Sequence, residues 1–442
     1  MKLAVVGAGW AGMACALEAV RGGHQVTLFD AARSAGGRAR RVDHVHGMAL
    51  DNGQHILIGA YRETLGLLRE VGVDLDAALL RLPLSLRFAD GGGLQVPARL
   101  QPPLDLLAGI ACAHGWTWRD KAGLVGAALR WRRMHFDCDA SLTVAALCRD
   151  LSPRVQQELI EPLCVSALNT PAAEASAQVF LRVLHDALFS ERGGADLLLP
   201  RVDLGALLPD PALRWLGQRG AELRIGTRVH AIAASADGWM VNGEGFDAAV
   251  LACAPWDAAR LVREAALPNT PLQVQAQDWL RRTEALRYIG IATVYARATP
   301  KRSDASAPSN TSRTPAATLT APMLALRSGA GAPAQFVFDR GQLGGPAGLL
   351  AFVVSASDLP RDALQQGVLA QARAQLELHA LEPLQTVVEK RATFACTPGL
   401  KRPPMQIAPG LQACGDYVDG PYPATLEGAV RSGLAAAKNL ST

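Results

Sequence analysis

The chain has 442 residues, of which 49% are hydrophobic and 19% are charged. This length and composition predict a globular protein with room for two or three domains. Its 44 basic and 40 acidic residues leave a net charge of +4, which is too balanced to indicate a protein that binds nucleic acid.

Three features of the sequence bear on its location in the cell. The N-terminus lacks the basic region of a secretory signal, and no apolar run approaches the roughly 18 residues of a membrane span. The eight cysteines include no C-x-x-C pair, which suits reduced thiols in the cytosol. We therefore expect a cytoplasmic protein.

His44 and His46 share one face of an expected strand but have no partners at ligand spacing, so no metal site is predicted.

The chain begins with the pattern of one βαβ unit. Residues 2–6 form a short apolar run, residues 7–12 read GAGWAG, and an alanine-rich helical stretch follows over 13–20. After two glycines, residues 25–30 form a second apolar run that ends in an acid. This order of strand, glycine turn, helix and strand predicts an α/β fold with a parallel sheet.

The glycine turn has the spacing of a dinucleotide site. Gly7 permits the tight turn, Gly9 lets a pyrophosphate approach the backbone, and Gly12 lets the helix pack against the strand. The N-terminus of the helix would face the phosphates with free N–H groups and a positive dipole. Asp30 lies where a carboxylate accepts from the ribose 2′-hydroxyl, so FAD or NAD is favoured over NADP.

The next segment favours FAD. Gly36 and Gly37 precede Arg38, a pattern that suits a backbone wrapped around a pyrophosphate with a guanidinium beside it. Residues 50–61 then read LDNGQHILIGAY, in which a polar cluster runs straight into aliphatic residues. We interpret this junction as a boundary, with the cofactor on one side and an apolar cavity on the other.

We expect later segments to complete the same nucleotide-binding fold. Strands are expected within 222–232, 248–255 and 410–417, and a closing helix over 424–440. We expect a Rossmann-like FAD-binding domain built from discontinuous segments, with an inserted α+β substrate domain. The FAD-binding segments are 1–60, 200–260 and 385–442; the substrate-binding segments are 61–199 and 261–384, with a flexible excursion at 299–318.

These motifs together resemble the flavin amine oxidase and phytoene desaturase superfamily. That superfamily also has a C-terminal Gly-Asp, here Gly415-Asp416, followed by a helix with E-G-A-x-x-S-G, here residues 427–433. Within it the chain more closely resembles the hydroxysqualene dehydroxylases of bacterial squalene and hopanoid pathways. The stretches that carry this closer resemblance span almost the whole chain, and they include DNGQH at 51–55 and LNTP at 168–171.

The resemblance implies non-covalently bound FAD. Asp416 would contact the ribityl chain, the helix N-terminus at Thr425 and Leu426 would point at the flavin ring, and the backbone at Val229 would hold the adenine. The full set of expected cofactor-binding residues is Gly7, Gly9, Trp10, Ala11, Gly12, Asp30, Gly37, Arg38, Asp51, Asn52, Gly53, Val229, Gly415, Asp416, Thr425 and Leu426.

The resemblance also implies a reaction. Reduced FAD would pass a hydride to hydroxysqualene as its allylic hydroxyl leaves, giving squalene, and a functional link to squalene-synthase-like enzymes would follow. Two alternatives stay open, a carotenoid or phytoene-type desaturase and a flavin-binding scaffold that carries prenyl lipids without turnover.

Two further expectations concern the acid and the membrane. His55 lies one step closer to the apolar run than the rest of the polar cluster and could protonate the leaving hydroxyl, whereas Asp51 should support flavin binding. Residues 104–134 combine apolar stretches with Trp116, Trp118, Trp131 and a basic trio at 130, 132 and 133. Either this segment forms a core helical pair, or it lies on the inner surface of the cytoplasmic membrane, where an insoluble substrate could enter.

Overall fold

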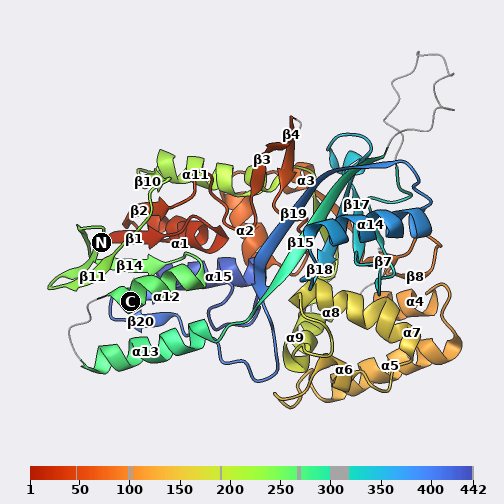
Figure 1. The fold of residues 1–442 in the computed structure, drawn as a ribbon. Helices are drawn as coiled ribbons and strands as arrows, with labels where there is room; N and C mark the ends of the chain where they lie inside the picture. Colours follow the sequence, from red (N-terminus) through yellow and green to blue (C-terminus); the bar gives the residue numbers. More distant parts are fainter. Residues whose placement is uncertain are drawn as a thin grey trace.

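A computed structural model describes residues 1–45, 47–97, 100, 103–189, 192–265, 270–298 and 318–440. The expected excursion at 299–318 lies outside these residues except for its last position, and His46 lies outside them as well. Figure 1 shows two parts, one built on the N- and C-terminal segments and one containing most of the middle of the chain, with the long strands β15 and β19 running between them.

The first part is built on a mixed sheet of six strands. Four neighbouring pairs are parallel, and the edge strand β20 is antiparallel to β21. In order across the sheet, the strands are β10 (Glu222–Ile225), β2 (Gln25–Asp30), β1 (Lys2–Val6), β14 (Ala248–Leu251), β21 (Leu411–Ala413) and β20 (Gln406–Ala408). The parallel sheet behind the N-terminal βαβ unit is thus confirmed.

Helices α1 (Trp10–Arg21) and α15 (Leu426–Leu440) pack closely against each other beside this sheet (Figure 1). Small residues on both helices allow the approach. A Cβ atom on Gly433 would lie 2.1 Å from the carbonyl oxygen of Ala11. The other helices of this part are α2 (Arg62–Glu70), α3 (Leu75–Ala78), α10 (Leu204–Leu207), α11 (Pro209–Gln218), α12 (Pro255–Glu264) and α13 (Thr270–Glu284).

The second part contains an antiparallel sheet of five strands. In order they are β16 (Met323–Ala325), β17 (Phe336–Asp339), β18 (Leu349–Ser355), β15 (Tyr288–Ala298) and β19 (Leu381–Phe394). Side chains alternate between its two faces, as strand geometry requires. Val337 and Phe352 pack in a core with helix α14 (Arg361–Leu376), whereas Phe336, Phe338 and Val353 face a cavity on the other side.

A group of helices completes the second part, at the lower right of Figure 1. They are α4 (Leu104–Ala111), α5 (Trp118–Arg133), α6 (Val144–Leu147), α7 (Pro153–Val155), the single π-helical turn at Gln156–Ile160, α8 (Glu161–Leu168) and α9 (Ala177–Leu188). A 3₁₀ turn at Arg340–Leu343 follows β17. Within the described residues, no helix is both long and apolar enough to cross a membrane. All eight cysteines are free thiols.

Small antiparallel ribbons join and flank these units. They pair β3 (Arg41–Val45) with β4 (Met48–Asp51), β7 (Ser85–Arg87) with β8 (Gly93–Gln95), β5 (Leu57–Ile58) and β6 (Leu79–Leu82) with β9 (Leu197–Pro200), and β11 (Ile232–Ser235) with β12 (Gly238–Val241) and β13 (Glu244–Phe246).

The structure differs from the expected elements in three places. The run 222–232 is not one strand, because β10 ends at Ile225 and the chain enters a separate ribbon at Ile232. The boundary expected at residue 260 falls inside α12. Helices α2 and α13, expected in the substrate domain, pack instead on the nucleotide-binding part, where α2 contacts α15 and α13 contacts β20.

Two helical glycines allow a matched test of the α1–α15 contact. Gly433→Ala forces a methyl group against the backbone of α1 and should lower the free energy of unfolding by about 1–3 kcal/mol, the usual range for overpacking. Gly66→Ala in α2 meets no atom within 4 Å and should instead be neutral or stabilising by up to about 1 kcal/mol. Chemical denaturation of both variants measures the difference; equal stabilities would contradict the close packing.

Candidate functional site

A single cavity of about 790 Å³ runs through both parts of the molecule. At one end it is lined by the glycine turn after β1, the end of β2 and the N-termini of α1 and α15. At the other end its walls are almost entirely apolar. The lining residues there include Leu84, Leu86, Leu163, Val165, Phe180, Leu184, Leu188, Leu197, Met323, Phe336 and Phe338.

The glycine turn has the close packing that its spacing predicts. Gly7 has a φ of +117°, and a Cβ atom there would lie 2.6 Å from the Ala252 carbonyl oxygen. A Cβ atom on Gly12 would lie 1.8 Å from the Gly7 carbonyl oxygen, so Gly12 allows the helix to approach the turn. A Cβ atom on Gly9, by contrast, would meet nothing closer than 3.9 Å and would point into open space. The chain itself therefore does not require glycine at position 9, but a ligand in the cavity would.

The N-terminus of α1 is electrostatically prepared for an anion. Its first turn contains no acidic residue, and no side chain caps it. Asp30 ends β2, and its carboxylate accepts from the backbone N–H groups of Ala8, within the turn, and of Ala32, at 2.7 Å each. The free N–H groups and the positive end of the helix dipole thus face the cavity.

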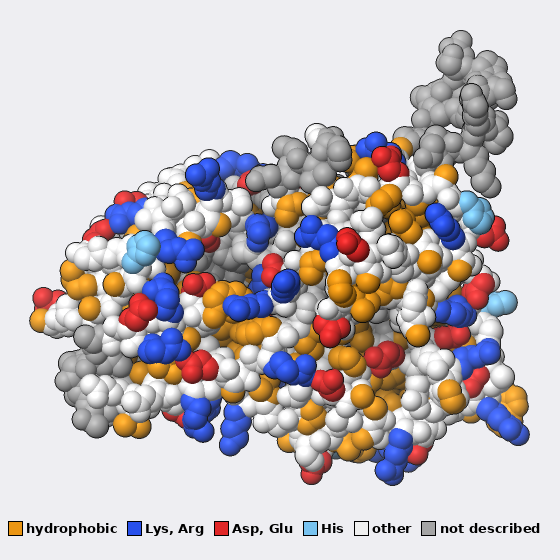
Figure 2. All heavy atoms as spheres, viewed as in Figure 1, with side chains coloured by type: hydrophobic (Ala, Val, Ile, Leu, Met, Phe, Trp, Pro, Cys, Tyr) orange, Lys and Arg blue, Asp and Glu red, His pale blue; other side chains and the backbone are white. Residues whose placement is uncertain are grey.

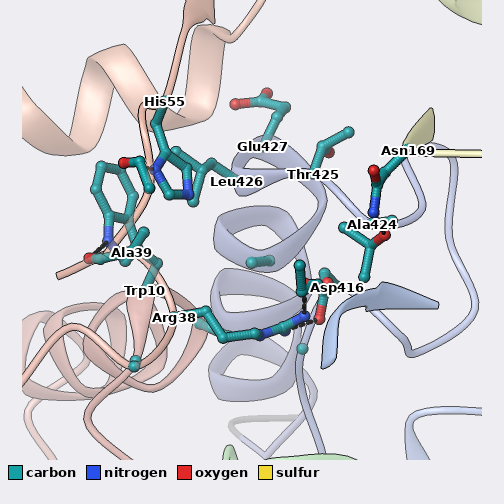
Figure 3. A pocket seen from close by; sticks show the side chains of 18 of the residues that line it. Trp10, Arg38, Ala39, His55, Asn169, Asp416, Ala424, Thr425, Leu426 and Glu427 are labelled. Carbon is teal, nitrogen blue, oxygen red and sulfur yellow. Dashed lines mark hydrogen bonds and ion pairs between the residues drawn. The ribbon is translucent and has the colours of Figure 1, made fainter. Parts of the chain in front are cut away.

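Arg38 is held by the C-terminal segment. Its guanidinium donates to the Asp416 carboxylate at 2.5 Å and to the Ala392 carbonyl oxygen at 2.7 Å (Figure 3). Burial alone would lower the pKa of Arg38, but the charge of Asp416 and its hydrogen bond, together with smaller contributions, raise it overall. Asn52 donates to the Arg38 carbonyl oxygen and to the Glu389 carboxylate. Arg38 was expected beside a pyrophosphate, but here its charge is already paired with Asp416.

The N-terminus of α15 lies in the middle of the cavity wall. Figure 3 shows Thr425, Leu426 and Glu427 there, with His55 to one side and Asn169 to the other. The Thr425 hydroxyl caps the helix by accepting from the Gly428 N–H at 2.9 Å. The buried Glu427 carboxylate accepts from the first N–H groups of α2 and from Arg431, so its charge is neutralised within the protein.

His55 lies at the expected boundary between polar and apolar lining. Its Nδ1 is 2.9 Å from the Gly53 carbonyl oxygen, which can only accept, so Nδ1 carries a hydrogen and Nε2 is left for another partner. Burial of the imidazole, together with the nearby Arg38 charge, lowers the pKa of His55 below its usual value. The neutral ring therefore predominates at neutral pH, rather than the charged ring that the sequence suggested.

Fifteen of the seventeen expected site residues line the cavity: Gly7, Gly9, Trp10, Ala11, Asp30, Gly37, Arg38, Asn52, Gly53, His55, Val229, Gly415, Asp416, Thr425 and Leu426. Of the other two, Gly12 acts through packing, as described above. Of the aliphatic run after the polar cluster, Ile56 and Ile58 line the cavity, while Leu57 is fully buried. This alternation follows from the strand β5.

Asp51 does not line the cavity, in contrast to the expectation for it. Its carboxylate points into the protein and accepts from the Leu204 N–H at 2.8 Å, while its backbone is bonded to the Tyr295 hydroxyl. Burial raises the pKa of Asp51 to about 6, although the Leu204 N–H and the Arg340 charge oppose the shift. Its position at the junction of β4, α10 and β15 makes it a structural residue.

Several lining residues were missed by the sequence reasoning. Tyr61 and Tyr422 precede helices that meet at the cavity, and Asp186 comes from α9. Gln54 and Tyr417 also line it, and the Gln54 Oε1 atom and the Tyr417 hydroxyl are buried with no hydrogen-bond partner among the described residues. Gln54 was not missed, because it belongs to the polar cluster that was expected at the cofactor, whereas no motif singled out Tyr61, Asp186 or Tyr422.

These buried polar atoms without hydrogen-bond partners bear on whether a flavin fits the cavity. A buried polar group without a partner is costly, so these two atoms indicate a polar ligand at this end of the cavity. The open space at Gly9 and the uncapped N-terminus of α1 indicate a ligand that carries phosphate. The residues present therefore fit FAD.

Replacing Asp51 tests its structural role. Asp51 holds its proton more tightly in the folded protein than in the unfolded chain, where the carboxyl titrates near 3.9. Protonation of Asp51 therefore stabilises the folded protein fully below pH 3.9, and this contribution is lost as the pH rises through about 6. Asp51→Asn keeps an oxygen for Leu204 without the buried charge. Its stability relative to the unmodified protein should rise between pH 4 and pH 8, by up to about 3 kcal/mol.

Denaturation across this pH range measures the effect, and flavin absorbance measures cofactor content. The variant should retain its flavin, because Asp51 does not line the cavity. Loss of flavin from a folded Asp51→Asn protein would show instead that Asp51 contributes to the cofactor site.

Comparisons with known proteins agree with this geometry. The chain is 26% identical over 465 residues to hydroxysqualene dehydroxylase from Rhodopseudomonas palustris, covering 98% of this chain and 96% of the relative. It is 39% identical over 79 residues to zeta-carotene desaturase from Synechocystis, but that match covers only 18% of this chain and 16% of the relative.

A solved structure of an oxidoreductase from Methanosarcina mazei shares the fold. It superposes with a TM-score of 0.72 at 16% sequence identity, covering 99% of this chain and all of that one. The family model for flavin containing amine oxidoreductases matches residues 10–441. The protein is thus an FAD-dependent oxidoreductase, and the chain belongs to the flavin containing amine oxidoreductase family.

Proposed function

We propose that the protein removes the hydroxyl group of hydroxysqualene to give squalene, using reduced FAD as the reductant. The observation that carries this proposal is one continuous cavity, in which the end at the glycine turn suits a phosphate and the other end has almost no charged lining. The name of the relative from Rhodopseudomonas palustris, which matches over nearly the full length of both chains, supports it. An isoprenoid chain would occupy the apolar end.

The residues at the polar end would hold FAD without a covalent bond. The turn at Gly7 and Gly9 and the first turn of α1 would receive the pyrophosphate, Asp30 the adenosine ribose, and Val229 the adenine. Asn52, Gly53, Asp416 and the N-terminus of α15 would lie along the ribityl chain and the flavin ring. FAD bound here in reduced form would supply the hydride.

The chain itself must supply a proton and exclude water. Loss of an allylic hydroxyl is eased by protonation of its oxygen, and the apolar walls keep competing water away from the carbon that is left. We assign the proton to His55. In the protonated ring, Nδ1 still donates to the Gly53 carbonyl oxygen, and Nε2–H becomes a second donor.

Anaerobic incubation of the reduced protein with hydroxysqualene tests the proposal. Squalene should appear while the flavin spectrum changes from reduced to oxidised. A desaturase would instead show oxidised flavin becoming reduced by a polyene hydrocarbon, and a scaffold without turnover would show no change with either compound. The last two outcomes would each replace the proposed reaction.

The same assay tests His55. His55→Ala should keep its flavin but form squalene about 100-fold more slowly or worse, the usual scale for a positioned acid. In the unmodified protein the rate should fall as pH rises above the lowered pKa of His55, because the protonated ring is then depleted. His379→Ala, which changes an exposed histidine outside the cavity, is the matched control. A flavin-loaded His55→Ala protein with a normal rate would exclude His55 as the acid.

The surface of α4 and α5 supports a further part of the proposal, peripheral contact with the inner face of the cytoplasmic membrane. Trp116 and Trp131 are buried, so part of the segment is core, as one of the two expectations had it. The other side is exposed and apolar: Leu104 is 60% exposed, Trp118 73% and Leu129 51%. Positions 118, 122, 126 and 129 recur at helical spacing, which places them along one face of α5.

Exposed basic residues accompany this face. Arg119, Arg132 and Arg133 lie on α5, and the acidic Asp120 is buried in the capping box of the helix. Figure 2 shows hydrophobic, basic and acidic side chains interspersed over the visible face. An apolar stripe beside excess positive charge suits an anionic lipid surface, from which an insoluble substrate could enter.

Flotation with phosphatidylglycerol vesicles tests this contact. The protein should float with anionic vesicles at low salt and less with phosphatidylcholine vesicles, and Trp118→Ser combined with Leu129→Ser should abolish flotation. Val274→Ser on α13, where the side chain is 59% exposed, is the matched control. No flotation at any salt concentration would contradict the membrane proposal, and retention of a squalene-synthase-like enzyme by this face alone would assign it to a protein partner.

A further inference from the structure

A polar pair interrupts the apolar half of the cavity. Asp186 on α9 and Tyr422, just before α15, both line the cavity, and the Tyr422 hydroxyl donates to the Asp186 carboxylate at 2.8 Å. Around Asp186 the same helix lines the cavity with Val183, Leu184 and Leu188. The Asp186 side chain is 26% exposed, and each of its carboxylate oxygens has a partner within the protein.

This pair can accept a hydrogen bond from a ligand but cannot donate one. The single hydrogen of Tyr422 is used by the Asp186 Oδ2 atom, and the Oδ1 atom is 2.8 Å from Nδ1 of His185. The pair has no hydrogen left to give, but both the phenol oxygen and the carboxylate keep lone pairs that can accept. A ligand group at this point must therefore be a donor.

The Tyr422 side of the pair is held against α15. The Thr425 hydroxyl donates to the Tyr422 carbonyl oxygen at 2.9 Å, and the Arg431 guanidinium lies 5.0 Å from the centre of the Tyr422 ring. A Cβ atom on Gly428 would lie 1.9 Å from the same carbonyl oxygen, so the loop packs tightly on α15. Tyr422 is thereby fixed next to the helix N-terminus that would face the flavin ring.

We infer that Asp186 and Tyr422 form the recognition site for the hydroxyl group of the substrate, by accepting a hydrogen bond from its O–H. The inference rests on the proposed function and names the groups that select an alcohol from other isoprenoids. Accepting from the alcohol O–H leaves the lone pairs of its oxygen available for a proton and raises the negative charge on that oxygen. A hydrocarbon or an ether cannot form this bond.

Equilibrium binding to the oxidised, FAD-loaded protein tests the inference without turnover. The ligands are hydroxysqualene, its methyl ether and squalene, and binding is followed by flavin fluorescence. The unmodified protein should bind the alcohol at least about 10-fold more tightly than the ether, the scale of a hydrogen bond to a charged group. In Asp186→Leu and in Tyr422→Phe this ratio should fall severalfold, while the Kd for squalene stays within about twofold.

The control and the contrary outcomes separate this inference from the proposed function. Asp137→Asn changes an exposed carboxylate that accepts from Gln178 of the same helix but does not line the cavity, and should keep the ratio. Unchanged discrimination in both cavity variants, or none in the unmodified protein, would overturn the recognition site even if squalene is still formed. Failure to form squalene with discrimination intact would overturn only the proposed reaction.

Discussion

The close contact of three backbone segments, the β1 turn, α1 and α15, is the constraint on which the rest of the structure depends. Gly12 lets α1 approach the turn, and Gly433 lets α15 approach α1. This contact brings two helix N-termini to one cavity, where their free N–H groups and dipoles can act on a single ligand. Residues more than 400 positions apart in the chain thereby build one cofactor site.

A second consequence is that the charged groups near the cofactor site are paired with one another within the protein. Arg38 is paired with Asp416, and Glu427 is bonded to α2 and Arg431. Each of these groups would be costly to bury alone. Arg38 is paired with a carboxylate from a distant segment, whereas Glu427 is paired with Arg431 on its own helix and bonded to N–H groups of the distant α2. The ionic groups therefore fix the position of the cavity walls, while backbone N–H groups and a few orphaned polar atoms are left for the ligand.

How much could be predicted from the sequence depended on whether the signal was local. The roles of Gly7 and Gly12 follow from short spacings, and the parallel sheet follows from the order of the elements around them. Asp51 could not be placed, because only the tertiary contact with Leu204 decides that its carboxylate turns away from the cavity. Asp186 and Tyr422 are 236 positions apart in the chain, so no local pattern relates them. The lowered pKa of His55 likewise comes from burial, which a sequence does not display.

The buried carboxylate of Glu427 also bears on the order in which the protein can assemble during synthesis. It accepts hydrogen bonds from the start of α2, 363 positions earlier in the chain, and two strands of the nucleotide-binding sheet, β20 and β21, also come from the last forty residues. While the ribosome still holds the C-terminal segment, α2 lacks this cap and the sheet lacks one edge. Domains usually fold as their segments emerge, but here the N-terminal motif must wait for the last helix. The residues that line the cofactor end of the cavity are therefore all present only after the last helix has been synthesised.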